Sequence, residues 1–446
     1  MMNTKERVFL INLGCAKNLV DSENMLGILV SRGFDLASSL DEADVAVVNT
    51  CGFIQAAVEE TIDTILEVVD LKKQGLLKKV MVAGCFVQRY GYKLRREIPE
   101  VDGWLGTGEI YRVADLMING RSGDPAPFFI GRPIYLADHA VPRVPTAPLY
   151  STYLKVAEGC SHRCSYCIIP SLRGHFRSRS PESLIIEAEK MISLGVKEIN
   201  LIAQDTTMYG RDLGGGTCLE DLLEKLVRLD GIRWIRLLYC HPNGISKRLL
   251  ELLDSEEVIC PYLDLPLQHV NEQILKAMGR DLGKETPWEL VERIKSIKRG
   301  ISLRTTLMVG FPGETEEMFD ELLNFVRMAM FDHLGVFVFS GEKGTPAALF
   351  SNDVPYQEAA CRRDRMMALQ ADISKRLNQR VVGHTMPVLV EGPSPETDLL
   401  LKGRTSTMAP DVDSQVLINK GDGVLGEIMQ VWISDAHAYD LIGEIR

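Results

Sequence analysis

The chain has 446 residues, which predicts two to four domains, and its 46% hydrophobic and 25% charged composition is that of a globular protein with ample apolar side chains to bury. No apolar run reaches the roughly 18 to 20 residues of a membrane span, and the N-terminus lacks a secretory cleavage pattern, so we expect a cytoplasmic protein with no membrane partner. The formal net charge of −11 gives no overall basic surface for nucleic acid and favours a basic partner.

The first region alternates short apolar runs with helical periodicity. The runs cover 8–15, 45–51 and 80–85, and the helical segments cover 22–32 and 55–73. Continuous apolar strands separated by helices predict a parallel sheet covered on both faces. We therefore expect a doubly wound α/β domain over 1–145, which ends in the Pro- and Gly-rich stretch 118–150.

A second series of strand and helix pairs follows over 146–378. Its six apolar strands are expected at 153–159, 198–204, 234–239, 262–268, 302–311 and 334–340. Eight such pairs would close a full barrel, so six predict an open, incomplete (β/α)6 barrel. A polar helix from about 355 to 381 leads out of it.

The last region, 379–446, contains short strands separated by Gly, Pro, Asn and Asp. This composition is typical of a small all-β, OB-like barrel. Ten Asp and Glu residues against five Lys and Arg residues give the region a net charge of −5. We expect an acidic tail domain.

Three cysteines, Cys160, Cys164 and Cys167, lie close together directly after the first strand of the incomplete barrel. One loop with this spacing can wrap three thiolates around three irons of a cubane cluster, which leaves the fourth iron open. Structural zinc, with His162 as the fourth ligand, is the alternative. The position at the C-terminal end of a barrel strand, where barrel enzymes keep their chemistry, disfavours zinc.

A second set of three cysteines is scattered in sequence but occupies equivalent places. Cys15, Cys51 and Cys85 each follow one of the first three strands, beside Gly14, Gly52 and Gly84. Strand ends in an open α/β sheet line one crevice, and glycine permits close backbone approach. Three ordinary buried cysteines are the alternative, but the matched positions favour a second cluster. The remaining cysteines, Cys218, Cys240, Cys260 and Cys361, show no ligand spacing and are assigned to packing.

The CxxxCxxC loop, with Tyr166 before its last cysteine, resembles the signature of the radical S-adenosylmethionine superfamily. The resemblance implies a 4Fe–4S cluster on Cys160, Cys164 and Cys167, whose open iron chelates S-adenosylmethionine. One electron from that cluster then cleaves the cofactor to a 5′-deoxyadenosyl radical. The protein positions the cofactor and excludes side reactions.

Over essentially the whole chain, the three-cysteine N-terminal domain, the radical core and the β tail resemble the methylthiotransferase family, which calls the tail a TRAM domain. One branch modifies isopentenyladenosine in tRNA, and the other modifies an aspartate of the small-subunit ribosomal protein S-twelve. LGCAKNLVDSE, EGCSHRCSYCIIPSLRGHFRSR, LIAQDTTMYGRD and PYLDLPLQHVNEQILKAMGR resemble the ribosomal-protein branch. The tRNA branch usually has Gln-Met where this chain has Ala16 and Lys17. The acidic tail also favours a basic protein over tRNA.

The resemblance implies two 4Fe–4S clusters, the second on Cys15, Cys51 and Cys85, and two uses of S-adenosylmethionine. One molecule gives the radical that abstracts hydrogen from the β-carbon of the substrate aspartate, and the other gives the methyl group. The partners would be protein S-twelve or the ribosomal subunit that contains it, an electron donor and a sulfur source. A non-catalytic redox sensor or electron carrier is a further alternative, disfavoured by the open iron.

Candidate contacts to S-adenosylmethionine lie at the strand ends. Tyr166 would present its backbone to the adenine, and Gln204, Gln268 and Arg304 would make polar contacts, with structural polarity at a barrel rim as the alternative. Gly310 lies in VGFPGETEE, which resembles the family's segment near the adenine but is equally explained by a strand-to-helix turn. CHP at 240–242 is no metal motif by itself, and RGHFRSR at 173–179 favours a solvated loop that could touch substrate or cofactor.

Overall fold

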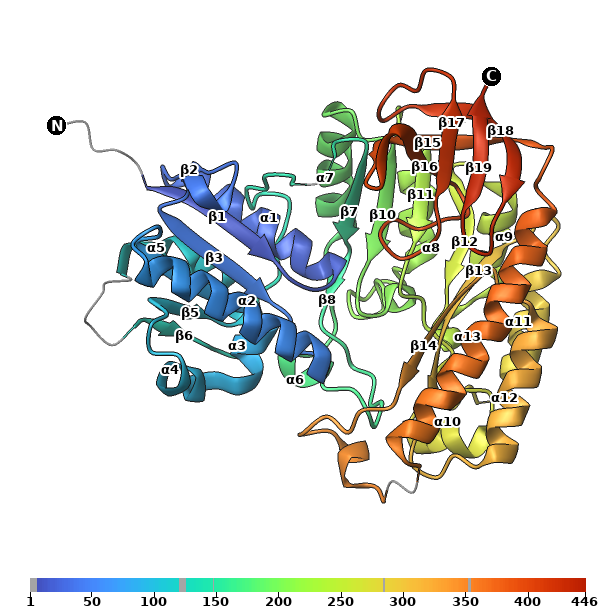
Figure 1. Cartoon of the computed structure of the whole chain (residues 1–446), viewed down its shortest axis with the longest axis horizontal. Helices are drawn as coiled ribbons and strands as arrows, with labels where there is room; N and C mark the ends of the chain where they lie inside the picture. Colours follow the sequence, from blue (N-terminus) through green and yellow to red (C-terminus); the bar gives the residue numbers. More distant parts are fainter. Residues whose placement is uncertain (1–5, 120–125, 147, 284, 352–353) are drawn as a thin grey trace.

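The computed structural model describes residues 6–119, 126–146, 148–283, 285–351 and 354–446. Figure 1 shows a blue N-terminal α/β unit beside a larger α/β unit, coloured green to orange, and a red barrel of strands against the latter. The mixed α/β architecture expected from the sequence is confirmed, including the small barrel at the C-terminal end. None of the described helices is long and apolar enough to cross a bilayer.

The N-terminal unit is a six-stranded parallel sheet in the order β2-β1-β3-β4-β5-β6. Its strands are β1 (Arg7–Asn12), β2 (Asp35–Leu36), β3 (Val45–Thr50), β4 (Lys79–Gly84), β5 (Gly103–Leu105) and β6 (Phe128–Phe129). Because successive side chains of a strand point to opposite faces, β3 contributes to two cores. Val48 packs with α2 (Gln55–Lys73) on one face, and Val47 packs with α1 (Ala16–Ser31) on the other.

Helix α1 begins at Ala16, six residues before the helix predicted at 22–32. Its first turns carry the buried polar side chains of Lys17, Asn18 and Asp21, so they lack the apolar periodicity that predicts a helix. Lys17 and Asp21 contact residues of the central unit, and Asn18 lies between that unit and the strand ends of its own sheet. The prediction was wrong at this end because an interdomain contact decides which face of the helix is buried.

The central unit is an open parallel sheet in the order β14-β13-β12-β11-β10-β7. Its strands are β7 (Ser151–Lys155), β10 (Glu198–Ile202), β11 (Trp234–Leu237), β12 (Ile259–Asp264), β13 (Ser302–Val309) and β14 (His333–Val338). They end two to four residues earlier than predicted. The residues after each strand leave the sheet and form loops at its C-terminal edge, where Gln204, Tyr239 and Gln268 lie.

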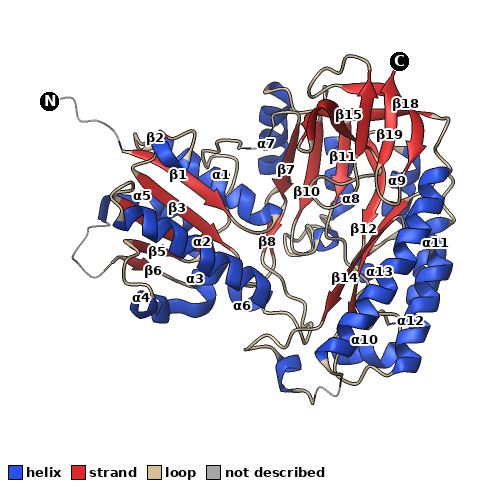
Figure 2. Cartoon of the chain, in the orientation of Figure 1, coloured by secondary structure: helices blue, strands red, loops and turns tan. Residues whose placement is uncertain are grey.

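Helices and two short strands surround these sheets, as Figure 2 shows in blue and red. The remaining helices of the N-terminal unit are α3 (Cys85–Tyr90), α4 (Leu94–Glu97) and α5 (Val113–Asn119). In the central unit they are α6 (Ile169–Arg173), α7 (Pro181–Ser193), α8 (Leu219–Leu226), α9 (Lys247–Ser255), α10 (Glu272–Met278), α11 (Pro287–Lys295), α12 (Glu316–Ala329) and α13 (Tyr356–Gln379). The short strands β8 (Ala157–Glu158) and β9 (Arg177–Ser178) pair antiparallel.

The C-terminal unit is a closed five-stranded barrel in the order β15-β16-β17-β19-β18. Its strands are β15 (Thr385–Ser394), β16 (Thr397–Thr405), β17 (Val416–Lys420), β18 (Ile428–Ala436) and β19 (Leu441–Ile445). It is joined to the central sheet through Glu198 of β10, which forms buried ion pairs with Arg236 of β11 and Arg404 of β16. The barrel is therefore fixed against the central unit by a charge cluster that excludes water.

Candidate functional site

All six cysteines of the two predicted sets line one cavity of ≈ 310 Å³ between the N-terminal and central units. Its other lining residues are Lys17, Asn18, Phe53, His162, Tyr166, Ile169, Arg173, Gln204, Tyr239, Cys240, His241, Pro266, Gln268 and Arg280. The cavity lies at the C-terminal ends of both parallel sheets, the edge at which open α/β folds bind ligands. Two sets of thiols from different units thus line the same cavity.

The N-terminal trio, Cys15, Cys51 and Cys85, comes from the loops after β1, β3 and β4, which are neighbours in the sheet. Glycines let these loops approach. At Gly14, where φ is +102°, a Cβ atom would lie 3.0 Å from Cys51 Cβ, and at Gly84 it would lie 2.5 Å from Asn49 Oδ1. Larger residues would push the three loops apart, so the glycines bring the thiols together.

The barrel trio, Cys160, Cys164 and Cys167, lies in the loop after β8. At Gly159, where φ is +77°, a Cβ atom would lie 2.2 Å from the carbonyl oxygen of His175, which explains the glycine before the first cysteine. The middle of the loop is held by Ser165, whose backbone N–H donates to Met278 O at 2.9 Å and whose hydroxyl donates to Ala277 O at 2.8 Å. The C-terminal end of α10 thus fixes the loop from outside.

The thiols fit cluster binding better than binding of a single ion. All ten cysteines are free. Among the described residues, the three sulfur atoms of neither trio all lie within 4.8 Å of one another, as the ligands of a single ion would. Wider spacing is what thiolates need when each binds a different iron of a cubane. His162 Nε2 lies 2.6 Å from Asp205 Oδ2 instead, which disfavours it as the fourth ligand of a zinc site with the barrel trio.

His162, Asp205 and His241 themselves form a compact polar group at the cavity wall. Their ligand atoms lie within 4.8 Å of one another, and the two imidazole rings stack at 4.1 Å between centroids. Burial lowers the pKa of His241 to about 3, so its ring is neutral at physiological pH. His241 Nδ1 accepts a hydrogen bond from the backbone N–H of Asn243 at 3.2 Å, which fixes its orientation.

Cys15 differs from the other thiols of the cavity in the direction of its pKa shift. Burial tends to raise the pKa of Cys15, but the positive charges of Lys17 and Arg173 outweigh it and lower that pKa. Burial raises the pKa of Cys85 to about 11. In the barrel trio, burial raises the pKa of Cys160 to about 11 and that of Cys167 to about 12. Metal ligation at these thiols must therefore release protons.

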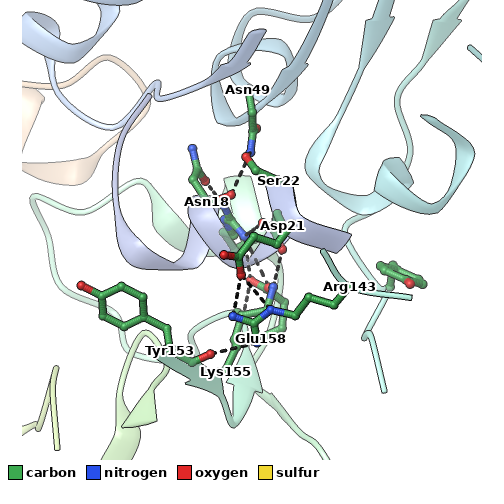
Figure 3. A network of polar contacts seen from close by, with 12 residues as sticks. Asn18, Asp21, Ser22, Asn49, Arg143, Tyr153, Lys155 and Glu158 are labelled. Carbon is green, nitrogen blue, oxygen red and sulfur yellow. Dashed lines mark hydrogen bonds and ion pairs between the residues drawn. The ribbon is translucent and has the colours of Figure 1, made fainter. Parts of the chain in front are cut away.

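A buried polar network joins α1 of the N-terminal unit to the central unit (Figure 3). Asp21 of α1 pairs with Lys155 of β7 and, at 2.7 Å, with Arg173 of α6. Glu158 of β8 accepts from Lys155 at 2.8 Å and from Arg173 at 3.3 Å, and the pKa of Glu158 falls to about 2 because these two cations outweigh the effect of burial. Arg173 also lies 3.5 Å from Cys85 Sγ, so the network ends at a thiol of the trio.

The predicted cofactor contacts divide into two groups. Tyr166, Gln204 and Gln268 line the cavity, and Gln268 adopts a left-handed backbone conformation with φ of 72°. Arg304 and Gly310 are not among its lining residues. Arg304 pairs with Asp264 at 3.1 Å and with Asp413 at 3.2 Å, and a Cβ at Gly310 would lie 2.4 Å from Ala359 Cβ, so their contact with the cofactor stays a prediction.

Other lining residues escaped the sequence analysis. Cys240, assigned to packing, is buried and also lines the cavity beside His241, and Arg173, expected in a solvated loop, is 2% exposed. Cys240 and His241 could have been found from their position along the chain, because they follow a strand of the central sheet as the barrel cysteines do. Lys17 and Arg280 gave no such signal, because the contact between the two units brings them to the cavity.

Three stretches of the chain match known families: Uncharacterized protein family UPF0004 over residues 7–106, the Radical SAM superfamily over 154–326 and the TRAM domain over 382–445. The "Ribosomal protein uS12 methylthiotransferase RimO" of Geobacter sulfurreducens is 48% identical over 100% of both chains. Proteins of the same name from Pelobacter propionicus and Bdellovibrio bacteriovorus are 47% and 42% identical over 99% of this chain and 98% and 97% of theirs.

Solved structures show a similar fold at low sequence identity. The radical S-adenosylmethionine methyltransferase TsrM from Kitasatospora setae is 17% identical, with a TM-score of 0.54 over 75% of each chain. The cobalamin-dependent S-adenosylmethionine radical enzyme OxsB is 12% identical, with a TM-score of 0.50 over 82% of this chain and 56% of that one. In the comparison with each, the similarity covers more than the central unit alone.

Proposed function

The chain belongs to the RimO family of ribosomal protein uS12 methylthiotransferases, and we propose that it adds a methylthio group to the β-carbon of an aspartate of uS12, the small-subunit protein S-twelve. The observation that carries the proposal is the single cavity lined by both cysteine trios. An enzyme that activates a carbon and then attaches sulfur to it needs both operations within reach of one substrate atom. One cavity lined by two thiol trios supports that requirement.

We propose two 4Fe–4S clusters, one held by Cys160, Cys164 and Cys167 and the other by Cys15, Cys51 and Cys85. When bound, the clusters and S-adenosylmethionine supply the radical, the site of sulfur transfer and the methyl group. Tyr166, Gln204 and Gln268 would hold S-adenosylmethionine from the cavity wall. Residues of α1 and of the loop after β8 line the cavity, so both units would contact a molecule bound there.

The same proposal covers the division of the chain and its partners. We assign residues 1–145 to the N-terminal methylthiotransferase domain, 146–378 to the radical core and 379–446 to the TRAM domain. The enzyme would act in the cytoplasm, on free uS12 or on the ribosomal subunit, and would need a one-electron donor and a sulfur source. Family membership disfavours both tRNA modification and a non-catalytic redox role.

The test is a reconstitution experiment. Anaerobically reconstituted enzyme is incubated with uS12, S-adenosylmethionine, sulfide and a reductant, and the tryptic peptides of uS12 are weighed. We expect a gain of one methylthio group on an aspartate. Replacement of either cysteine trio by alanine should abolish the gain, whereas Cys361→Ala, at an exposed cysteine outside the cavity, should leave it unchanged.

Two results would contradict the proposal. Absence of the mass gain under conditions in which the enzyme cleaves S-adenosylmethionine to 5′-deoxyadenosine would remove uS12 as the substrate. Appearance of a methylthiolated adenosine in tRNA incubated with the same enzyme would assign the chain to the other branch of methylthiotransferases.

A further inference from the structure

Lys17 is a buried lysine whose ammonium pairs with no carboxylate of the residues that the structure describes. It lies in the first turn of α1, is 4% exposed and lines the cavity with the six cysteines. Its ammonium lies 3.0 Å from the centroid of the Tyr239 ring. Within the described part of the chain, no oxygen accepts a hydrogen bond or forms an ion pair with this ammonium, and a buried ammonium without an acceptor is costly.

The other two cations of the cavity wall are already engaged. Arg173 pairs with Asp21 and Glu158. Arg280 donates to Pro266 O at 2.6 Å and lies 3.8 Å from Cys164 Sγ, beside the barrel trio. Of these three cations, Lys17 is the one from which no oxygen of the described residues accepts, and it lies on the side of the N-terminal trio, where its charge also lowers the pKa of Cys15.

The backbone of Tyr239 fixes the ring that supports Lys17. Tyr239 has a left-handed conformation with φ of 59°, which is uncommon for an aromatic residue. Its N–H donates to Asp264 Oδ2 at 2.9 Å, and its carbonyl accepts from Thr206 N at 3.0 Å. Such strain concentrates at functional sites. Here it holds an aromatic face from the central unit against a lysine from the N-terminal unit.

We propose that Lys17 is a specificity-determining residue whose ammonium binds the side-chain carboxylate of the substrate aspartate. The inference rests on the proposed function and deepens it. The reacting β-carbon is bonded directly to the carboxyl carbon, so an ion pair at the carboxylate positions the carbon that is modified. Lys17 lies in the first turn of α1, where the positive end of the helix dipole also favours an anion.

The test compares the binding of two ligands by the cluster-loaded enzyme without reductant, so that no turnover occurs. The ligands are uS12 and its variant in which asparagine replaces the target aspartate. We expect the wild-type enzyme to bind uS12 about tenfold more tightly than the asparagine variant, the effect of one charge-assisted hydrogen bond. In Lys17→Met the ratio should fall to about one, and Lys17→Arg should restore a preference for aspartate.

Two measurements separate this role from a purely structural one. Iron content and the electron paramagnetic resonance spectrum show whether Lys17→Met retains both clusters, and the binding ratio is also measured on metal-free protein, so that cluster loss cannot account for a change. A wild-type ratio near one, or an undiminished ratio in Lys17→Met, overturns the role of Lys17 even when wild-type enzyme methylthiolates uS12. Failure of the wild-type enzyme to modify uS12 overturns the proposed function, and this inference with it.

Discussion

Replacement of Glu198 by glutamine should weaken the attachment of the C-terminal barrel in a pH-dependent way. Glu198 is fully buried and accepts from Arg236 at 2.9 Å, from Arg404 at 2.6 Å and from Ser151 Oγ at 2.7 Å. Burial alone would raise the pKa of Glu198, but Arg404 and Arg236 outweigh it and lower the pKa from 4.5 to about 2. The carboxylate is therefore charged in the folded protein at any ordinary pH.

The size of the destabilisation follows from the difference between the pKa of Glu198 in the unfolded chain and in the folded protein. A pKa of 4.5 in the unfolded chain and about 2 in the folded one corresponds to roughly 3 kcal/mol of stability, fully present above pH 4.5 and lost as the pH falls toward 2. At neutral pH Glu198→Gln should cost about 3 to 5 kcal/mol, because it leaves the buried guanidinium of Arg236 without a carboxylate. At acidic pH the difference in unfolding free energy between wild type and Glu198→Gln should become smaller.

The measurement is urea unfolding of wild type and Glu198→Gln between pH 7 and pH 3.5, followed by circular dichroism, which gives the unfolding free energy of each protein at each pH. Glu251→Gln is the control, since Glu251 forms an exposed pair with Lys247 and its loss should change the unfolding free energy very little at any pH. A difference between wild type and Glu198→Gln that stays constant over this pH range would refute the linkage argument.

Two further substitutions test the cavity. Gly14→Ala places a Cβ 3.0 Å from Cys51 Cβ at a φ of +102°, so we expect reconstituted protein to lose iron from the N-terminal trio while the barrel trio keeps its own. Iron content is measured in two backgrounds, one without the barrel cysteines and one without the N-terminal cysteines, and should fall only in the first. Arg173→Met leaves Asp21 and Glu158 with Lys155 alone and should destabilise the protein by about 3 to 5 kcal/mol. Because it also removes a positive charge 3.5 Å from Cys85 Sγ, it should make the N-terminal cluster harder to reduce. Arg143→Met is its control, because Arg143 pairs with Glu23 and Glu187 without contacting a thiol; an equal shift of the reduction potential in this variant would contradict the role of Arg173.

Cysteine positions carried most of the information about the candidate site. Cys15, Cys51 and Cys85 could be grouped from the sequence because each follows an apolar strand, and neighbouring parallel strands bring their C-terminal ends to one edge. The same local pattern, an apolar strand followed by a cysteine, thus occurs three times in the sequence. The six strands of the central sheet were predictable for the same reason, with errors confined to their ends, where loop residues turn toward the cavity.

What the sequence did not predict depends on contacts between units. The acidic composition of the tail suggested an acidic surface, but Asp413 is turned inward, where it pairs with Arg304 and accepts from the hydroxyl of Tyr262 at 2.6 Å. Asp411 accepts from the hydroxyl of Tyr153 at 3.0 Å. Part of the tail's negative charge therefore serves attachment to the central sheet, which weakens net charge as an argument about the partner.

The buried network between α1 and the central unit explains how two separate sheets can present one site. Buried ion pairs are weak evidence for stability, because desolvation of both charges opposes their attraction. Their stronger consequence is geometric, since removing Asp21 from Arg173 and Lys155 by a small shift of α1 would leave the buried Asp21 carboxylate without these partners and both cations with Glu158 alone. The arrangement in which Asp21, Glu158, Lys155 and Arg173 are all paired places Cys85 3.5 Å from Arg173 and Lys17 against Tyr239. The network therefore sets the position of the N-terminal trio relative to the barrel trio, on which any transfer between two clusters depends.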